Sequence, residues 1–181
     1  MKSYQTIDEL PKKLGLFPLT GAVLFPQTQL PLNIFEPRYL QMIDEALSSP
    51  DRIMGMIQPN VTKADPNSKN LKKVGCAGRI SSFSETGDGR YLVTLTGLIR
   101  FEIDQELDTT TPYRQIMANY ENYKEDIKPA DTENIDRKSL LVLIKKYLEQ
   151  RNLLIDWEMI EQSPTEQLIN YSGVLVPFEP E

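Results

Sequence analysis

The sequence predicts an α+β fold that is mainly β: a small barrel of short strands with one early helix, followed by a C-terminal helical segment. Three observations predict this class. Thirteen prolines and nine glycines in 181 residues indicate a loop-rich, partly β architecture. Apolar and polar residues alternate with a period of two along residues 91–103, as in a half-buried strand. After residue 124 the apolar residues recur instead at helical spacing.

Short apolar runs broken by proline open the barrel, at 14–19, 23–26 and 30–35. Proline has no N–H to give to the ladder of a sheet, so we expect edge or bulged strands here rather than central ones. Pro37 then suits the first turn of a helix, where the missing N–H is not needed. Apolar residues follow it at helical spacing, namely Leu40, Ile43 and Leu47.

The middle of the chain carries the clearest strand signals. Residues 59–73 are polar and contain turn residues, which predicts a long loop. The sequence Thr86-Gly87-Asp88-Gly89 predicts a hairpin turn, because its glycines tolerate positive φ. We expect four strands around these loops: 52–58, 74–85, 91–103 and 113–123. In the last of them Tyr120 and Tyr123 cannot share one face unless the strand is bulged.

The composition changes near Tyr123, and the polar stretch 124–134 with Pro129 reads as a linker. We therefore divide the chain into a β-barrel, residues 1–124, and a helical segment of the same domain, residues 125–181.

Three helices are expected in that segment. Asp131 or Thr132 is expected to cap the first, and Asp156 the second, with Trp157 inside. The third is expected to open with a capping box, Ser163-Pro164-Thr165-Glu166. Residues 176–181 read like the entry to another helix.

Composition excludes several classes of chemistry. The chain has no histidine and one cysteine, so neither a Ser-His-Asp nor a Cys-His system can form, and Cys/His zinc sites lack ligands. Neither G-x-x-x-x-G-K-[ST] nor G-x-G-x-x-G occurs, and no Ser–Lys or carboxylate pair is marked by its local sequence. We therefore assign no catalytic, cofactor-binding or metal-binding residue, expect no cofactor, and do not expect an enzyme.

Charge and hydropathy bear on partners and location. The formal net charge of −6 disfavours nucleic acid as a partner. No apolar run approaches the length of a membrane span, so no membrane partner is expected. The N-terminus has no apolar stretch behind Lys2, so we expect no signal peptide and a cytoplasmic protein.

Four features could still bind something. Cys76, in an apolar strand, reads as a buried and inert thiol. The lysine-rich loop 63–73 reads as solvated, and Trp157 as a lock between the helices and the barrel. The proline-aromatic stretch 16–39 could offer a groove for an extended polypeptide, with surface residues of 25–39 expected to carry the binding. The alternative is that Phe17, Phe25 and Phe35 belong to the barrel core.

Several motifs in this chain resemble the N-terminal substrate-binding domain of Lon proteases, over roughly residues 12–176. The motifs are Leu16-Phe17-Pro18-Leu19, Val23-Leu24-Phe25-Pro26, Leu30-Pro31-Leu32-Asn33-Ile34-Phe35-Glu36-Pro37-Arg38-Tyr39, Val74-Gly75-Cys76-Ala77-Gly78-Arg79-Ile80, Gly97-Leu98-Ile99-Arg100-Phe101 and Pro112-Tyr113-Arg114.

The resemblance, which is to the stand-alone bacterial members, implies a PUA-like β-barrel followed by a helical segment. It also implies a non-catalytic module that recognises unfolded or extended polypeptide, alone or with a protease. The ATPase and Ser–Lys peptidase domains of full Lon proteases would lie outside this chain. Two alternatives stay open, a PUA-like nucleic-acid binder and a small-ligand binder. Exposed proline-rich edges could also pair two copies into a homodimer.

Overall fold

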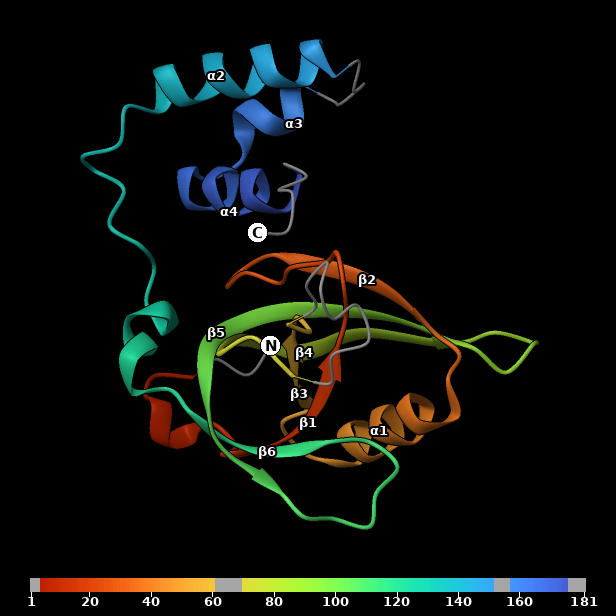
Figure 1. The fold of residues 1–181 in the computed structure, drawn as a ribbon. Helices are drawn as coiled ribbons and strands as arrows, with labels where there is room; N and C mark the ends of the chain where they lie inside the picture. The colour runs from red at the N-terminus through yellow and green to blue at the C-terminus, as the bar shows by residue number, and fades with distance from the viewer. Residues whose placement is uncertain (1–3, 61–69, 152–156, 176–181) are drawn as a thin grey trace.

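The fold is built around one long strand, β5. A computed structural model describes residues 4–60, 70–151 and 157–175. In this part of the chain the strands are β1 (Lys13–Pro18), β2 (Gln29–Ile34), β3 (Ile53–Ile57), β4 (Val74–Glu85), β5 (Tyr91–Leu107) and β6 (Gln115–Asn119). They form one six-stranded sheet in the order β2-β5-β4-β3-β1-β6, and a further β5–β6 pairing closes it into a barrel (Figure 1). The mainly β, α+β class is confirmed.

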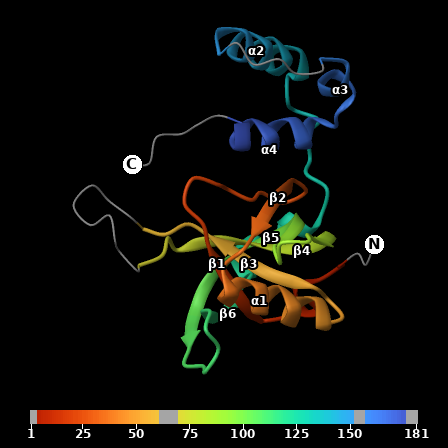
Figure 2. The ribbon, with the colours of Figure 1, turned by 90° about the vertical axis from the view of Figure 1, so that its right-hand side faces the viewer.

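The helices fall into two groups. Near the barrel are η1 (Ile7–Glu9), α1 (Pro37–Ser48) and η2 (Glu121–Ile127), and after a linker come α2 (Arg137–Gln150), α3 (Trp157–Gln162) and α4 (Thr165–Leu175). We call α2, α3 and α4 the helical unit. It lies at one side of the barrel, and α4 is its nearest helix to the barrel in both views (Figures 1 and 2). Within the described ranges no helix has the length and apolar character needed to cross a membrane.

Where apolar and polar residues alternate without a break, the sequence predicted the strand correctly. Along β5 the side chains on one face are buried from Val93 through Leu95 and Ile99 to Phe101, and β4 has the bounds expected for 74–85. The expectation of edge strands holds for β2, whose one strand neighbour in the described chain is β5. It is wrong for β1, which lies between β3 and β6. Pro18 is tolerated there because it is the last residue of the strand.

One other prediction of a strand was wrong and a second strand was predicted too long. Residues 23–25 have no regular secondary structure and Pro26 begins a turn, so no strand forms there. The strand expected over 113–123 is only β6, because the chain turns into η2 directly afterwards. This turn resolves the conflict between the two tyrosines: Tyr120 and Tyr123 both pack on the same half of the core without sharing a strand.

The helices were placed correctly but capped differently. The cap of α2 is Asp136, whose carboxylate accepts the backbone N–H of Ser139 at 3.1 Å, and not Asp131 or Thr132. Three expectations fall partly or wholly outside the described residues: the lysine loop over 61–69, the cap at Asp156 and the helix entry at 176–181. The division at residues 124 and 125 stays a prediction.

Candidate functional site: a groove between the barrel and the helical unit

The barrel has a seam on one edge of β5. β5 pairs with β2 through residues 91–96 and with β6 through residues 102–107, so residues 97–101 have no strand neighbour on that edge in the part of the chain that the structure describes. Unpaired backbone N–H and C=O groups must find other partners or water. What fills the seam therefore defines the surface beside it.

A tight turn at Phe25-Pro26-Gln27-Thr28 closes one end of the seam. The Thr28 N–H donates to the Phe25 carbonyl at 3.2 Å, and Gln27 has a φ of 63°. Proline followed by a residue with positive φ is the pattern of a type II turn, which usually places glycine or asparagine where Gln27 lies. The buried Thr28 hydroxyl also donates to the Phe25 carbonyl, at 2.8 Å.

Gly97 allows this turn to lie against β5. The Gln27 N–H donates to the Gly97 carbonyl and the Gly97 N–H donates to the Thr28 carbonyl, both at 2.9 Å. A Cβ atom on Gly97 would lie 2.0 Å from the Phe25 carbonyl oxygen. Only glycine therefore permits this approach of the two backbones.

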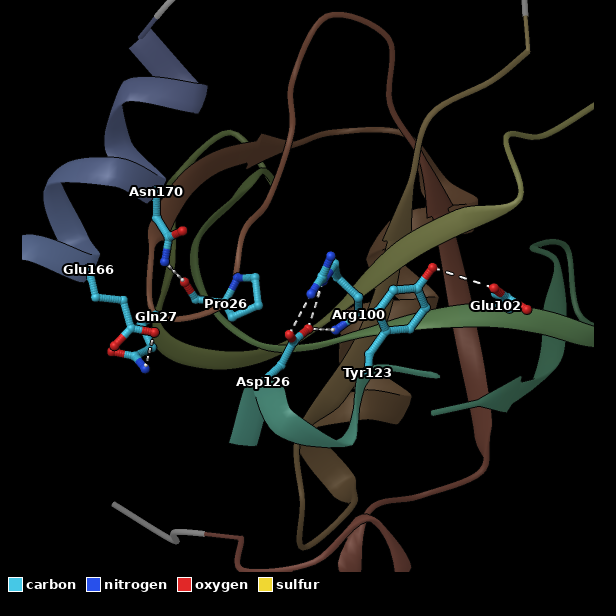
Figure 3. A network of polar contacts seen from close by, with 8 residues as sticks. All are labelled: Pro26, Gln27, Arg100, Glu102, Tyr123, Asp126, Glu166 and Asn170. Atoms are coloured by element: carbon cyan, nitrogen blue, oxygen red, sulfur yellow. Dashed lines mark hydrogen bonds and ion pairs between the residues drawn. The ribbon is translucent and has the colours of Figure 1, made fainter. Parts of the chain in front are cut away.

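Asp126 of η2 closes the other end of the seam (Figure 3). Its carboxylate accepts three hydrogen bonds from Arg100: from the backbone N–H at 3.0 Å, from Nε at 2.8 Å and from Nη2 at 2.7 Å. The Asp126 side chain is 11% exposed. These hydrogen bonds raise the pKa of Arg100 above its ordinary value, and the guanidinium also stacks 4.6 Å from the centre of the Tyr123 ring.

Three contacts of α4 dock the helical unit onto this region. The Asn170 side chain donates to the Pro26 carbonyl at 2.9 Å, and the Gln27 side chain donates to Glu166 at 2.9 Å (Figure 3). Gly173 faces the ring of Phe25, because a Cβ atom on Gly173 would lie 2.8 Å from that ring. The second carboxylate oxygen of Glu166 accepts the N–H of Ala130 in the linker, at 3.1 Å.

Two cavities remain between these contacts, and we call them together the groove. One, of about 530 Å³, includes amide and aromatic side chains in its lining: Gln27, Gln29, Gln167 and Tyr171. The other, of about 570 Å³, includes a set of apolar residues: Phe25, Pro26, Pro129, Ile135 and Ile169. We call them the amide-lined cavity and the apolar cavity, and Asp126 lines both.

The groove presents two kinds of surface to a ligand. Amide side chains both donate and accept hydrogen bonds, and apolar walls favour apolar side chains. Cys76, the one thiol of the chain, lies in the core, where burial raises its pKa to about 12. Among the described residues, no three His, Cys, Asp or Glu side chains are grouped so as to hold a metal ion.

The structure separates the aromatic residues of the stretch 16–39. Phe17 is buried against Tyr39, with ring centres 4.6 Å apart. Phe25 is half-buried beside the helical unit. Phe35 is 62% exposed at the far end of β2, near Arg90. The stretch therefore does not form a single binding surface.

The role expected for Trp157 was wrong. Its side chain interacts within the helical unit and does not lock that unit to the barrel. Its indole N–H donates to Glu161, and Lys145 of α2 lies 5.2 Å from its ring centre.

Sequence reasoning missed the residues that build the groove. Glu166 was expected to close a capping box on Ser163. Instead its oxygens accept hydrogen bonds from Gln27 and Ala130, and the Ser163 N–H donates to carbonyls of α3. The signal that was available was Pro26-Gln27-Thr28, a proline followed by polar residues, which favours a turn over a strand.

Comparison with known proteins identifies the family. A sequence model of the ATP-dependent protease La (LON) substrate-binding domain matches residues 13–181. A Lon protease of Flavobacterium johnsoniae is 34% identical over 107 residues, which are 59% of this chain and 13% of that protein. One of Dictyoglomus thermophilum is 26% identical over 171 residues, or 94% of this chain and 20% of that protein. The chain thus spans at most a fifth of these relatives.

Solved structures have the same fold. The N-terminal domain of a Mycobacterium avium complex Lon protease has a TM-score of 0.62 at 15% identity, covering 93% of this chain and 85% of that one. A Lon N-terminal domain protein from Xanthomonas campestris has a TM-score of 0.53 at 20% identity, covering 91% and 90%. With the family match across nearly the whole sequence, these results show that the chain belongs to the substrate-binding domain family of the ATP-dependent protease La (LON).

Proposed function

We propose that this domain is a non-catalytic module that captures extended polypeptide segments in the groove. Membership of a substrate-binding domain family supports the binding role. The observation that carries the proposal is that two cavities with different linings lie along one seam of the barrel. The amide-lined cavity suits the backbone of an extended chain, which presents the same N–H and C=O groups whatever its sequence. The apolar cavity suits its side chains.

The relatives supply the context of the proposal. Proteins named Lon protease extend far beyond the region that matches this chain. Captured polypeptide would therefore be passed to a protease, either in the same chain or as a separate partner. The expected cytoplasmic location is part of the same proposal.

A titration tests the proposal. Isotope-labelled protein is titrated with reduced, carboxymethylated α-lactalbumin, an unfolded chain, and separately with single-stranded RNA. We expect backbone amide shifts with the unfolded chain in three segments: 25–29, 96–100 and 165–171. Shifts with RNA alone would replace the proposal by the nucleic-acid alternative. An absence of shifts with both would leave the small-ligand alternative.

Two variants locate the binding surface. Ile169 is 39% exposed and lines the apolar cavity, whereas Phe35 is exposed at the far end of β2. Because a charge in an apolar wall disfavours apolar ligands, Ile169→Asp should weaken binding by about tenfold, equivalent to roughly 1.4 kcal/mol. The matched control Phe35→Asp should change it by less than about twofold. The opposite ranking would assign binding to the hairpin end of the barrel.

A further inference from the structure

The charged residues of the apolar cavity are unequally paired. Among the described residues, Arg100 and Lys128 are the two basic residues of its lining, and both have carboxylate partners: Asp126 at 2.7 Å and Glu125 at 2.9 Å. Two further carboxylates of the lining, Asp131 and Glu166, accept hydrogen bonds from neutral donors. Glu166 accepts hydrogen bonds from the Gln27 amide and from the Ala130 N–H. Asp131 accepts the Glu133 N–H at 3.0 Å.

We infer that the groove selects polypeptide segments in which a cationic side chain lies next to apolar ones. This inference rests on the proposed function and names its substrate class. An apolar side chain that enters beside Ile135 and Ile169 shares the cavity with Asp131 and Glu166, which have no cationic partner among the described residues. A lysine or arginine at a neighbouring position of the segment supplies that partner, and an acidic residue there is repelled.

The amide-lined cavity adds no preference of its own for the charge of the bound segment. Among the described residues, Asp126 is the one carboxylate in its lining, and Arg100 holds that carboxylate with three hydrogen bonds. Its remaining polar side chains are uncharged amides and hydroxyls, which accept either sign of neighbouring charge. Selectivity for charge therefore belongs to the apolar cavity, and recognition of the backbone to the amide-lined one.

Three fluorescein-labelled peptides of twelve residues test the inference. They share one apolar centre and differ only in their flanking residues, which are lysine, glutamine or glutamate. Fluorescence anisotropy at low salt should give a dissociation constant for the lysine peptide roughly three- to tenfold below that of the glutamate peptide. The ratio should shrink in 0.5 M salt, where exposed charges are screened.

Isosteric variants separate the effect of the cavity on peptide binding from the effect of the net charge of −6, which by itself attracts cations. Asp131→Asn combined with Glu166→Gln should bring the ratio near one. Asn can still accept the Glu133 N–H. The matched control is Asp104→Asn combined with Asp108→Asn, two exposed carboxylates outside the groove, which removes the same charge and should leave the ratio unchanged.

The outcomes are distinguishable. Equal binding of all three peptides by the unaltered protein overturns the charge preference and leaves the proposed function standing. A ratio that falls equally in the groove and control variants assigns the preference to net charge and overturns the inference. Failure of every peptide to bind, whatever its flanks, overturns the proposed function as well.

Discussion

At the scale of single residues, Cys76 makes the free energy of unfolding depend on pH in the alkaline range. The thiol is 2% exposed, and burial raises its pKa from 9.0 to about 12. A group whose pKa is raised on folding stabilises the protein fully below its unfolded pKa and loses that contribution as the pH rises toward the folded pKa. Between about pH 9 and 12 the unfolded thiol has lost its proton while the folded thiol keeps it.

We therefore expect the free energy of unfolding to fall by about 1.4 kcal/mol per pH unit above pH 9 through this thiol alone. Urea unfolding at several pH values measures the slope. Tyr113, whose pKa is raised to about 12 mainly by burial, adds to the slope above pH 10. Cys76→Ala should make the pH dependence of the free energy of unfolding shallower by about 1 kcal/mol per pH unit near pH 9.5, where the unfolded thiol is about three-quarters ionised, whatever its effect on stability at pH 7. An unchanged slope would show that the thiol ionises in the folded protein.

At the scale of elements, the cap of α2 decides how well that helix is formed. Asp136 accepts hydrogen bonds from both the N–H and the hydroxyl of Ser139, and these lower its pKa. Asp136→Ala removes both, so we expect amides in the first turns of α2 to exchange about fivefold faster. Asp131→Ala is the control, because Asp131 lies before the helix and its removal should leave exchange in α2 unchanged.

The position of its proline protects the edge strand β2 from pairing with a second copy of the chain. Gly97 donates to the carbonyl of Thr28, so Leu30 and Leu32, two and four residues along, are the hydrogen-bonded partners of β5. Pro31, opposite Thr94, therefore directs its nitrogen away from β5 toward the open edge. This geometry opposes pairing of two copies through β2, and the expected homodimer stays a prediction.

Pro31→Val should consequently promote self-association, because it restores an N–H to the open edge. We expect a concentration-dependent shift from monomer toward dimer in sedimentation velocity, about tenfold stronger than in the unaltered protein. Thr94→Val changes the residue opposite Pro31 on β5 without altering that edge, so it should not associate more. Equal association of the two variants would point to the outer face of the sheet instead.

The same elements show what sequence could and could not predict. β5 was predicted well because its alternation persists over many residues and one face must be buried. β4 was predicted well because the hairpin signal at 86–89 fixes its end and pairs it with β5. The turn at Phe25 was misread because four residues carry too little pattern to separate a strand from a turn. The groove was missed because its walls come from β5, η2 and α4. Contacts such as Gln27 with Glu166 join residues 139 positions apart, which no local pattern records.

At the scale of the whole molecule, binding depends on the docking of the helical unit against the barrel. The contacts that hold α4 to the turn are two hydrogen bonds, from Asn170 and to Glu166, and the packing of Gly173 on Phe25. The chain between η2 and α2 is an extended linker (Figure 1). We expect two parts joined by a linker and held by these contacts to move relative to one another, which would open and close the groove.

Gly173→Leu tests this dependence. Leucine favours a helix over glycine by about 0.8–1 kcal/mol, so α4 itself should be strengthened. Its Cβ atom, however, would lie 2.8 and 2.9 Å from atoms of the Phe25 ring, so either the ring or the helix must shift, and we expect the helix to move off the turn. We expect amides at 25–29 and 96–100 to exchange at least about fivefold faster, polypeptide binding to be lost, and exchange in β3 and β4 to stay unchanged.

The matched control is Gly87→Leu, because a Cβ atom on Gly87 meets nothing within 4 Å. It should leave both exchange and binding as they are. If Gly173→Leu instead kept full binding while exchange at 25–29 increased, the helical unit would be dispensable for capture and the barrel seam alone would hold the polypeptide. If neither changed, the Phe25 ring would have to rotate aside at little cost, and docking would rest on the hydrogen bonds of Asn170 and Glu166.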